Sequence, residues 1–211
     1  MPEATRILAI RHGQTAWNAS ARIQGHTDIG LDALGQWQAR QLARALGHEE
    51  LQAIYSSDLA RARDTAAPLA AARGLPVGTD TGLRERAFGE FEGLSFEQIE
   101  SRWPEQALAW RRRDPSFGPP GGEMLRDFRE RVVAALNRLA LAHRGQCIAL
   151  VTHGGVLDLL YREAARIALD APRTWQVANA GINRLLHSGE GLVLVGWGDV
   201  GHLEHARDDL L

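Results

Sequence analysis

The chain has 211 residues, of which 45% are hydrophobic and 24% charged, and its formal net charge is −2 at pH 7. This composition is typical of a globular domain and excludes a disordered or collagen-like chain. The charge gives no sign of a nucleic-acid partner, and no apolar run approaches the ~18 residues of a membrane helix. We therefore expect a single domain over residues 1–211, located in the cytoplasm, with neither nucleic-acid nor membrane partners.

The basic and sulfur-containing residues exclude further classes of protein. All 24 basic residues are arginines, which excludes a lysine Schiff base and the lysine of a P-loop. The single cysteine, Cys147, can form neither an internal disulfide nor a cysteine-rich zinc site. Because Cys147 lies in an apolar run, we expect it in the core.

The first part of the chain alternates predicted strands and helices. A short apolar run predicts a buried strand over Thr5–Ile10. Apolar residues on one stripe then predict a helix over Leu34–Leu46, with Asp32 as its N-cap. A short strand over Gln52–Ser56 and an alanine-rich helix over Leu59–Arg73 follow.

The middle of the chain is the least regular part. Residues 77–94 are rich in glycine and charge and predict no regular element, whereas Ser95–Trp103 has the pattern of a capped helix. Residues 104–122 contain four of the eight prolines, which predicts a loop. We expect the segment 84–122 to form a lid or specificity insert.

The last part returns to alternating elements. A long helix is predicted over Glu123–His143, a strand over Gln146–Val151 and a helix over Leu157–Leu169. Two final strands, Ile182–His187 and Leu192–Trp197, are joined by a glycine-rich hairpin signal. The whole pattern predicts a three-layer α/β sandwich, with a mainly parallel central sheet flanked by helices and a helical or loop lid insert.

Two histidines follow two of the predicted strands directly. His12 and His153 each come just after a buried strand and just before a glycine, Gly13 or Gly154. Ligands of open α/β sheets bind beyond the carboxyl ends of the strands. If the two strands are neighbours, both imidazoles face one crevice, and the free N–H groups near Gly154 can hold an anion.

Two arginines lie near these histidines in the predicted fold. Arg11 precedes His12, and Arg61 lies in the first turn of a predicted helix, where its charge opposes the helix dipole. A bound anion would remove this conflict, and the planar guanidinium fork suits a phosphate. We expect Arg11 and Arg61 to bind an anion and Arg63 to be an exposed surface residue.

An acid partner for this site comes from the irregular segment after residue 83. Glu85, Glu90 and Glu92 all lie in this glycine-rich stretch, and loops of this kind carry function more often than packing. The spacing alone does not choose among the three carboxylates. It also does not decide which histidine is the nucleophile.

Five sequence blocks, in this order and at this spacing, resemble the histidine phosphatase superfamily. The resemblance is to the branch that contains cofactor-dependent phosphoglycerate mutases and small-metabolite phosphatases, and it covers nearly the whole chain. The matching blocks are Arg11–Asn18, Gln24–Gly35, Ser56–Ala66, Leu83–Gly93 and Val151–Gly155.

The resemblance assigns catalytic roles to residues of these blocks. It implies that His12 accepts the phosphoryl group and that Arg11, Arg61 and His153 neutralise the charge on its oxygens. It also implies that Glu85 protonates the leaving oxygen and then deprotonates the attacking water. No metal and no cofactor are implied, because the arginines supply the positive charge. The implied substrate-binding residues are Gly13, Asn18, Gln24, Gly25, Gly154, Phe88, Arg111 and Arg112.

Departures from the mutase pattern favour a phosphatase. The mutases of this family carry a His-Tyr pair and a lysine at the places where Ala87, Phe88 and Phe96 stand here. Against this, Trp110-Arg111-Arg112 is similar to a mutase element that holds a substrate carboxylate. We expect hydrolysis of a small phosphorylated metabolite, either a sugar phosphate or a phosphorylated acid, by a monomer or homodimer. A phosphoglycerate mutase and a non-catalytic phosphate-ligand binding protein are the alternatives.

Overall fold

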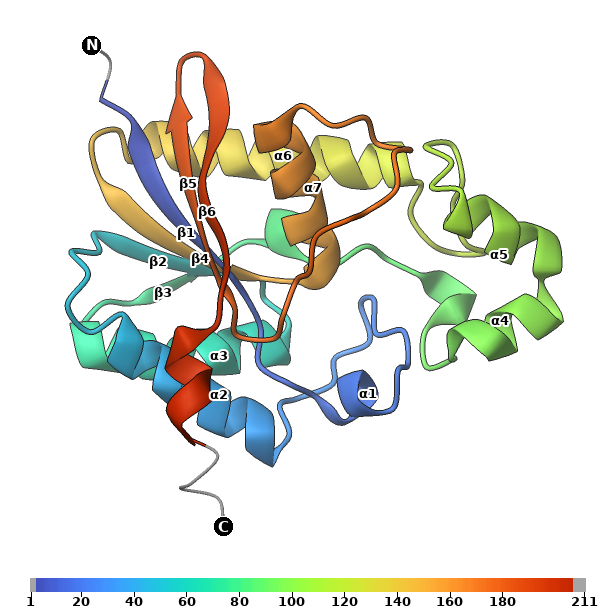
Figure 1. The fold of residues 1–211 in the computed structure, drawn as a ribbon, viewed down its shortest axis with the longest axis horizontal. Helices are drawn as coiled ribbons and strands as arrows, with labels where there is room; N and C mark the ends of the chain where they lie inside the picture. Colours follow the sequence, from blue (N-terminus) through green and yellow to red (C-terminus); the bar gives the residue numbers. More distant parts are fainter. Residues whose placement is uncertain (1–2, 207–211) are drawn as a thin grey trace.

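Six strands form one mixed sheet in the computed structural model, which describes residues 3–206; residues 1–2 and 207–211 of the predicted domain lie outside the described part. The sheet order is β3-β2-β4-β1-β5-β6 (Figure 1). β1 to β4 are parallel to one another, β5 is antiparallel to β1, and β6 is antiparallel to β5. The strands are β1 (Thr5–Arg11), β2 (Ala53–Ser56), β3 (Val77–Thr79), β4 (Cys147–Thr152), β5 (Ile182–Ser188) and β6 (Gly191–Asp199).

Helices cover both faces of this sheet, which confirms the predicted three-layer architecture (Figure 1). Helices α2 (Ala33–Ala45) and α3 (Ala60–Arg73) pack on one face, while α6 (Leu125–Ala142) and α7 (Gly154–Ala165) pack on the other. No helix within residues 3–206 has both the length and the apolar character needed to cross a membrane.

Each inner strand supplies side chains to both helical layers, because successive residues of a strand point to opposite faces of the sheet. In β1, Leu8 and Ile10 belong to the cluster with α2 and α3, while Ile7 and Ala9 belong to the cluster with α6 and α7. Cys147 on β4 is buried in the first of these clusters, as predicted. A strand buried on both faces has no polar positions, which explains the uninterrupted apolar runs of the sequence.

Three short elements differ from the sequence predictions. β3 lies in the segment predicted as irregular. The sequence does not reveal this strand, because its three residues include only one apolar side chain and so show no periodic pattern. Helix α5 (Pro104–Arg111) occupies part of the loop predicted over 104–122, since Pro104 stands in the first turn, where its missing N–H breaks no helical bond. Helix α1 (Ala16–Ala19) is a single turn stabilised by a capping box.

The boundaries predicted for α7 are wrong at both ends. The helix starts at Gly154 rather than at Leu157, directly after β4. It ends at Ala165, because Arg166 adopts a left-handed backbone conformation with φ 54°. The early start places the first N–H groups of α7 beside the carboxyl end of the central strands.

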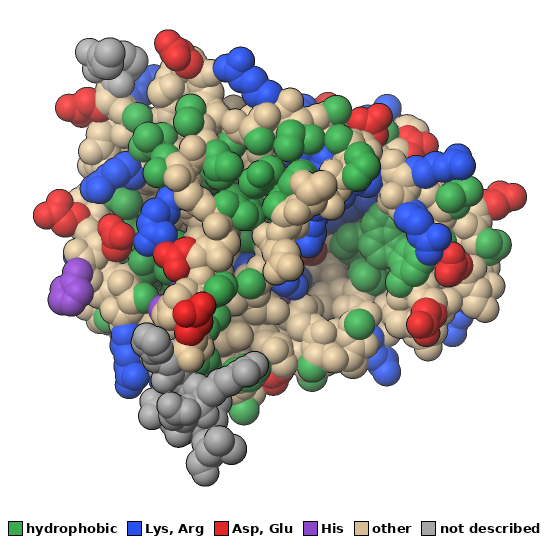
Figure 2. Space-filling view, viewed as in Figure 1, with side chains coloured by type: hydrophobic (Ala, Val, Ile, Leu, Met, Phe, Trp, Pro, Cys, Tyr) green, Lys and Arg blue, Asp and Glu red, His purple; other side chains and the backbone are tan. Residues whose placement is uncertain are grey.

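The insert 84–122 projects from one end of the molecule (Figure 1) and contains α5 and α4 (Phe96–Arg102). It has a small apolar centre of its own, in which Phe91 and Ile99 are fully buried. The space-filling view shows a hollow between this insert and the body of the protein (Figure 2).

Candidate active site

The two histidines that follow β1 and β4 lie side by side. β1 and β4 are parallel neighbours, with Arg11 paired to Thr152, and His12 N donates to the carbonyl of Thr152 at 2.9 Å. The rings of His12 and His153 have centroids 5.2 Å apart, and both side chains are buried. The predicted juxtaposition of two imidazoles at one edge of the sheet is therefore present.

The hydrogen bonds of the two imidazoles indicate their neutral tautomers. His12 Nδ1 lies 2.7 Å from the carbonyl oxygen of Gly13, which can only accept, so Nδ1 carries the proton and Nε2 keeps its electron pair. His153 Nδ1 accepts from Arg61 Nε at 3.2 Å, so its Nε2 carries the proton. That buried Nε2 has no partner among residues 3–206. His12 thus offers an electron pair and His153 offers a free donor.

Both imidazoles are held in the neutral form. Burial lowers the pKa of His12 well below 6.5, and the positive charges of Arg11 and Arg61 lower it further. Burial also lowers the pKa of His153 well below 6.5, again with a contribution from Arg61. A neutral imidazole is the nucleophilic form, so His12 keeps a reactive Nε2 even in mildly acidic solution.

Within residues 3–206, neither arginine of this site forms an ion pair with a carboxylate. Arg61 is fully buried and donates to the carbonyls of Thr27 (3.0 Å) and Gly25 (2.7 Å). Arg11 donates to the carbonyl of Val177 at 2.6 Å, and its buried Nε has no partner within the described residues. Burial lowers the pKa of Arg11 to about 10 and also lowers that of Arg61, because an unpaired charge is poorly solvated there. A bound anion would compensate both charges.

Asn18 is oriented by a residue that the sequence analysis did not single out. Its Oδ1 accepts from Thr15 N at 3.1 Å and from Asn179 Nδ2 at 3.3 Å. Asn179 Nδ2 also donates to the carbonyl of His12 at 2.9 Å. With Oδ1 occupied, the Nδ2 group of Asn18 is the part of this side chain that can donate to a ligand.

Among the three candidate carboxylates, Glu85 is the one that lines the same cavity as His12. Its Oε2 accepts from Gly155 N at 3.0 Å and its Oε1 from Arg86 N at 2.9 Å. A Cβ at position 155 would stand 2.2 Å from Glu85 Oε1, so a larger residue there would displace the carboxylate from this position. Glu92 instead accepts from three backbone N–H groups and one hydroxyl of neighbouring loops, and Glu90 is exposed.

Two adjoining cavities meet at Arg11, Glu85 and Phe88, which line both. The smaller, of about 180 Å³, is lined by Arg11, His12, Asn18, Arg22, Ile23, Gln24, Gly25, Arg61, Glu85 and Phe88. The larger, of about 280 Å³, is lined by Arg11, Glu85, Arg86, Phe88, Trp110, Arg113, Leu125, Phe128, Gly154, Gly155, Asp158, Leu159, Arg173 and Val177. The smaller cavity has the donors for a phosphoryl group, and the larger has room for the group attached to it.

The structure brings most of the predicted site residues to these cavities. All the predicted catalytic residues except His153 line the smaller cavity, and His153 contacts both His12 and Arg61. Asn18, Gln24, Gly25, Phe88 and Gly154 line one cavity or the other. Gly13 is buried, and its Cα packs against Gly35, where a Cβ would stand 2.6 Å from a carbonyl oxygen.

Arg111 and Arg112 are not brought to either cavity. Arg111 forms an exposed ion pair with Glu100 at 2.9 Å and lies over the ring of Phe96, and Arg112 is exposed. The next residue, Arg113, lines the larger cavity instead and pairs with Asp158. Arg113 has a left-handed backbone conformation, with φ 56°, just after helix α5 ends.

Sequence reasoning missed several residues of the larger cavity. Arg113 carried a usable signal, because it is the third arginine of a triplet. Arg86, Asp158 and Arg173 carried none, since they come from three segments that only the fold brings together. No group of three or more His, Cys, Asp or Glu side chains within residues 3–206 is arranged to hold a metal ion.

Because both histidines are neutral in the folded protein, we expect the free energy of unfolding to decrease in acid. A histidine whose pKa is lower in the folded state than in the unfolded chain binds a proton on unfolding. Stability therefore falls as the pH drops below about 6.5, by up to about 1.4 kcal/mol per pH unit for each histidine. Urea unfolding between pH 7 and 5, in phosphate-free buffer, measures this slope.

A variant with both His12→Gln and His153→Gln is the control for this slope. It places a neutral amide group at each position, and an amide cannot take up a proton in this pH range. The free energy of unfolding of this variant should change less steeply with pH than that of the wild type. Equal slopes for the two proteins would contradict the neutral assignment of the histidines.

The chain is similar to known proteins in both sequence and overall structure. The sequence matches the histidine phosphatase superfamily (branch 1) over residues 7–200. It is 40% identical to phosphoglycerate mutase-like protein 4 of Arabidopsis thaliana, over 94% of this chain and 86% of that protein. It is 35% identical to the metal-independent phosphoserine phosphatase of the same plant, over 95% of this chain and 84% of that protein. The solved structure of a mycobacterial glucosyl-3-phosphoglycerate phosphatase superposes with a TM-score of 0.83 at 35% identity, covering 92% of this chain and 99% of that one.

Proposed function

The chain belongs to branch 1 of the histidine phosphatase superfamily, and from this premise we propose that it hydrolyses small phosphomonoesters through a phosphohistidine on His12. One observation carries the proposal. The electron pair of His12 Nε2 lies in a cavity with two arginines that have no carboxylate partner among the described residues, Arg11 and Arg61. A nucleophile beside unpaired buried cations fits a substrate that is both electrophilic and strongly anionic.

In the first step, His12 Nε2 attacks the phosphorus and a P–N bond forms. The bond between phosphorus and the ester oxygen breaks, and Glu85 gives its proton to that oxygen. Arg11, Arg61 and His153 Nε2–H donate to the phosphoryl oxygens, whose charge shifts during the transfer. These donors are fixed before the substrate arrives, so little reorganisation is needed in the transition state.

In the second step, water hydrolyses the phosphohistidine. Glu85, now a carboxylate, takes a proton from the water as its oxygen attacks the phosphorus. The P–N bond breaks, inorganic phosphate leaves, and His12 and Glu85 return to their starting protonation states. The arginines supply the positive charge that metal ions supply in other phosphoryl-transfer enzymes.

The larger cavity supports a phosphorylated acid as the substrate. Four arginines and two carboxylates line it, so its charge is positive. Burial lowers the pKa of Arg86 to about 10, and within the described residues this side chain donates only to the carbonyls of Phe117 and Glu123. Arg173 is exposed, and its one hydrogen bond within residues 3–206 goes to the carbonyl of Trp175. A carboxylate on the leaving group would meet these charges, and two of the relatives above have names that refer to such acids.

The test compares 3-phosphoglycerate with glycerol 3-phosphate, both in the presence of EDTA. The two esters differ by one carboxylate, and a charge-assisted hydrogen bond contributes about 1.5–3 kcal/mol, or about 10- to 100-fold. We expect phosphate release from both, with kcat/KM higher for 3-phosphoglycerate by such a factor. An Arg173→Gln variant should lose about tenfold on 3-phosphoglycerate and almost nothing on glycerol 3-phosphate.

The same assay separates the alternatives. Formation of 2-phosphoglycerate without phosphate release would indicate a mutase. The name of one relative, phosphoglycerate mutase-like protein 4, refers to this activity. Equal kcat/KM for the two esters would contradict the acidic substrate class and leave the hydrolase intact. Loss of all activity in EDTA would contradict the metal-independent mechanism.

A further inference from the structure

The segment that carries Glu85 has little regular structure to hold it. It follows the single 3-10 turn η1 (Thr81–Leu83) and precedes η2 (Gly89–Phe91), and none of the strands found within residues 3–206 includes it. A general acid must be placed to within a fraction of an ångström, because a displacement of about 1 Å can cost about 100-fold in rate. The contacts that fix this backbone therefore bear directly on catalysis.

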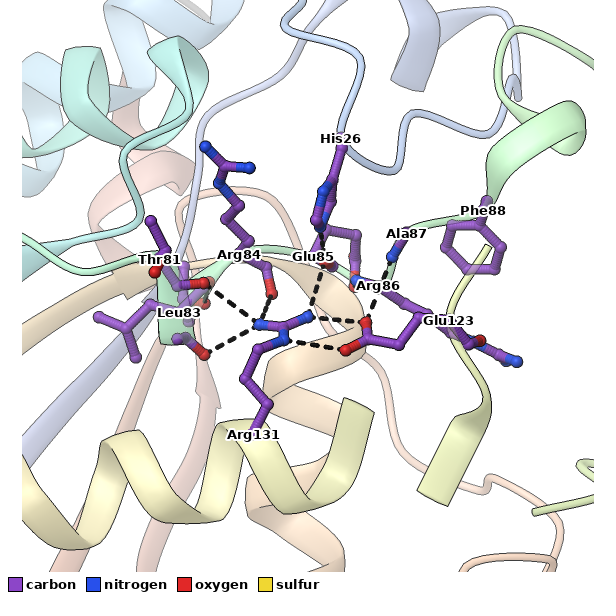
Figure 3. A network of polar contacts seen from close by, with 12 residues as sticks. His26, Thr81, Leu83, Arg84, Glu85, Arg86, Ala87, Phe88, Glu123 and Arg131 are labelled. Atoms are coloured by element: carbon purple, nitrogen blue, oxygen red, sulfur yellow. Dashed lines mark hydrogen bonds and ion pairs between the residues drawn. The ribbon is translucent and has the colours of Figure 1, made fainter. Parts of the chain in front are cut away.

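One side chain of α6, that of Arg131, donates hydrogen bonds to several carbonyl groups of this segment (Figure 3). Arg131 donates from Nη1 to the carbonyls of Thr81 (3.3 Å), Gly82 (3.1 Å) and Arg84 (3.1 Å). Its Nη2 donates to the carbonyl of Glu85 itself at 3.2 Å. Four main-chain carbonyls thus accept from one guanidinium. In solvent-exposed loops, by contrast, main-chain carbonyls normally accept from water.

Glu123 holds that guanidinium from the other side (Figure 3). Its Oε1 and Oε2 accept from Arg131 Nε (2.9 Å) and Nη2 (2.8 Å), a bidentate pair that fixes the plane of the fork. The main chain of Glu123 also binds the segment, because its N–H donates to the carbonyl of Ala87 at 2.9 Å and its carbonyl accepts from Arg86 Nε at 2.9 Å. The pair therefore clamps the backbone on both sides of Glu85.

From this geometry we propose that Arg131, oriented by Glu123, is a positioning residue for the general acid Glu85. The proposal rests on the function proposed above. Arg131 does not line either cavity, so it acts through the Glu85 backbone rather than on the substrate. Lysine cannot replace it, because an ammonium has three donors on a flexible stem and lacks the planar fork that serves four carbonyls and a carboxylate together.

The experiment separates acid catalysis from the rest of the reaction. A p-nitrophenolate leaves as an anion without help, whereas the alkoxide of glycerol 3-phosphate must be protonated as it leaves. With enzyme in excess, rapid quench measures leaving-group release at saturation for both esters. For Arg131→Lys we expect release from glycerol 3-phosphate to slow by about tenfold or more, and release from p-nitrophenyl phosphate to stay within about twofold.

Arg129 provides a matched control on the same helix. It forms a bidentate pair with Glu163, at 2.6 and 3.0 Å, and within residues 3–206 it forms no hydrogen bond or ion pair with the Glu85 segment. Arg129→Lys should leave both rates unchanged. A general loss of packing would lower both rates together, so equal losses on the two esters in Arg131→Lys would overturn the proposal, as would no loss on either.

A second variant, Glu123→Gln, tests the same proposal if Arg131→Lys does not fold. Glu123→Gln keeps the size of the side chain and removes the charge that orients Arg131. It should slow only the alkyl ester, and by less than Arg131→Lys does; equal effects on both esters would again overturn the proposal. Absence of leaving-group release in the wild type would instead contradict the proposed function, so the two failures are distinguishable.

Discussion

Replacing His12 with alanine is expected to lower kcat for any phosphomonoester by at least about 10⁴-fold, because the covalent route through the phosphohistidine is lost. Arg11 and Arg61 still line the smaller cavity, and His153 still contacts Arg61. The variant should therefore still bind inorganic phosphate. In the wild type, rapid quench with labelled substrate should trap acid-labile, base-stable phosphate on the protein, and His12→Ala should trap none.

The control for this prediction is His48→Ala. His48 is exposed and lies outside both cavities, so its loss tests only the general effect of removing an imidazole. This variant should keep wild-type kcat and wild-type labelling. Labelled protein in the His12→Ala variant would mean that another residue is the nucleophile, and His153 would then be the next to test.

The position of the histidines was predictable because it depends on strands that the sequence marks clearly. Two uninterrupted apolar runs, each followed by His-Gly, predict two buried parallel strands whose carboxyl ends carry His12 and His153. Arg61 was predictable for a different reason, since it breaks the charge preference of a helix N-terminus. In each case a local pattern fixes the place of the side chain, and few long-range contacts are needed.

The carboxylate could not be chosen on the same basis. Glu85 and Glu92 lie in one irregular segment, and only the tertiary contacts separate them: Gly155 N–H binds the first, and the loop around His26 binds the second. Asn179 and Arg131 act through backbone carbonyls of distant segments, a role that leaves no mark in the sequence. The sequence is therefore most informative where secondary structure positions a group, and least informative where a loop is held by side chains.

Replacing Glu85 with glutamine should affect the two steps of the reaction differently for different esters. Glutamine can neither protonate an alkoxide nor deprotonate water. With glycerol 3-phosphate the first step fails, and we expect kcat to fall by about 10²- to 10⁴-fold with no phosphoenzyme formed. With p-nitrophenyl phosphate the first step needs no acid, so one equivalent of p-nitrophenol should appear in a burst before turnover stalls.

The burst is the informative part of this experiment, because it assigns both proposed roles to one residue. After the burst, phosphohistidine should accumulate on His12, since the base that activates water is missing. Glu90→Gln, which changes an exposed carboxylate of the same segment, should behave as the wild type. If Glu85→Gln lost the burst as well, Glu85 would be needed for binding or for folding of the site, and the acid would have to be sought elsewhere. If it kept full steady-state turnover on both esters, Glu85 would have no part in proton transfer, and the clamp of Arg131 on its backbone would have no catalytic consequence.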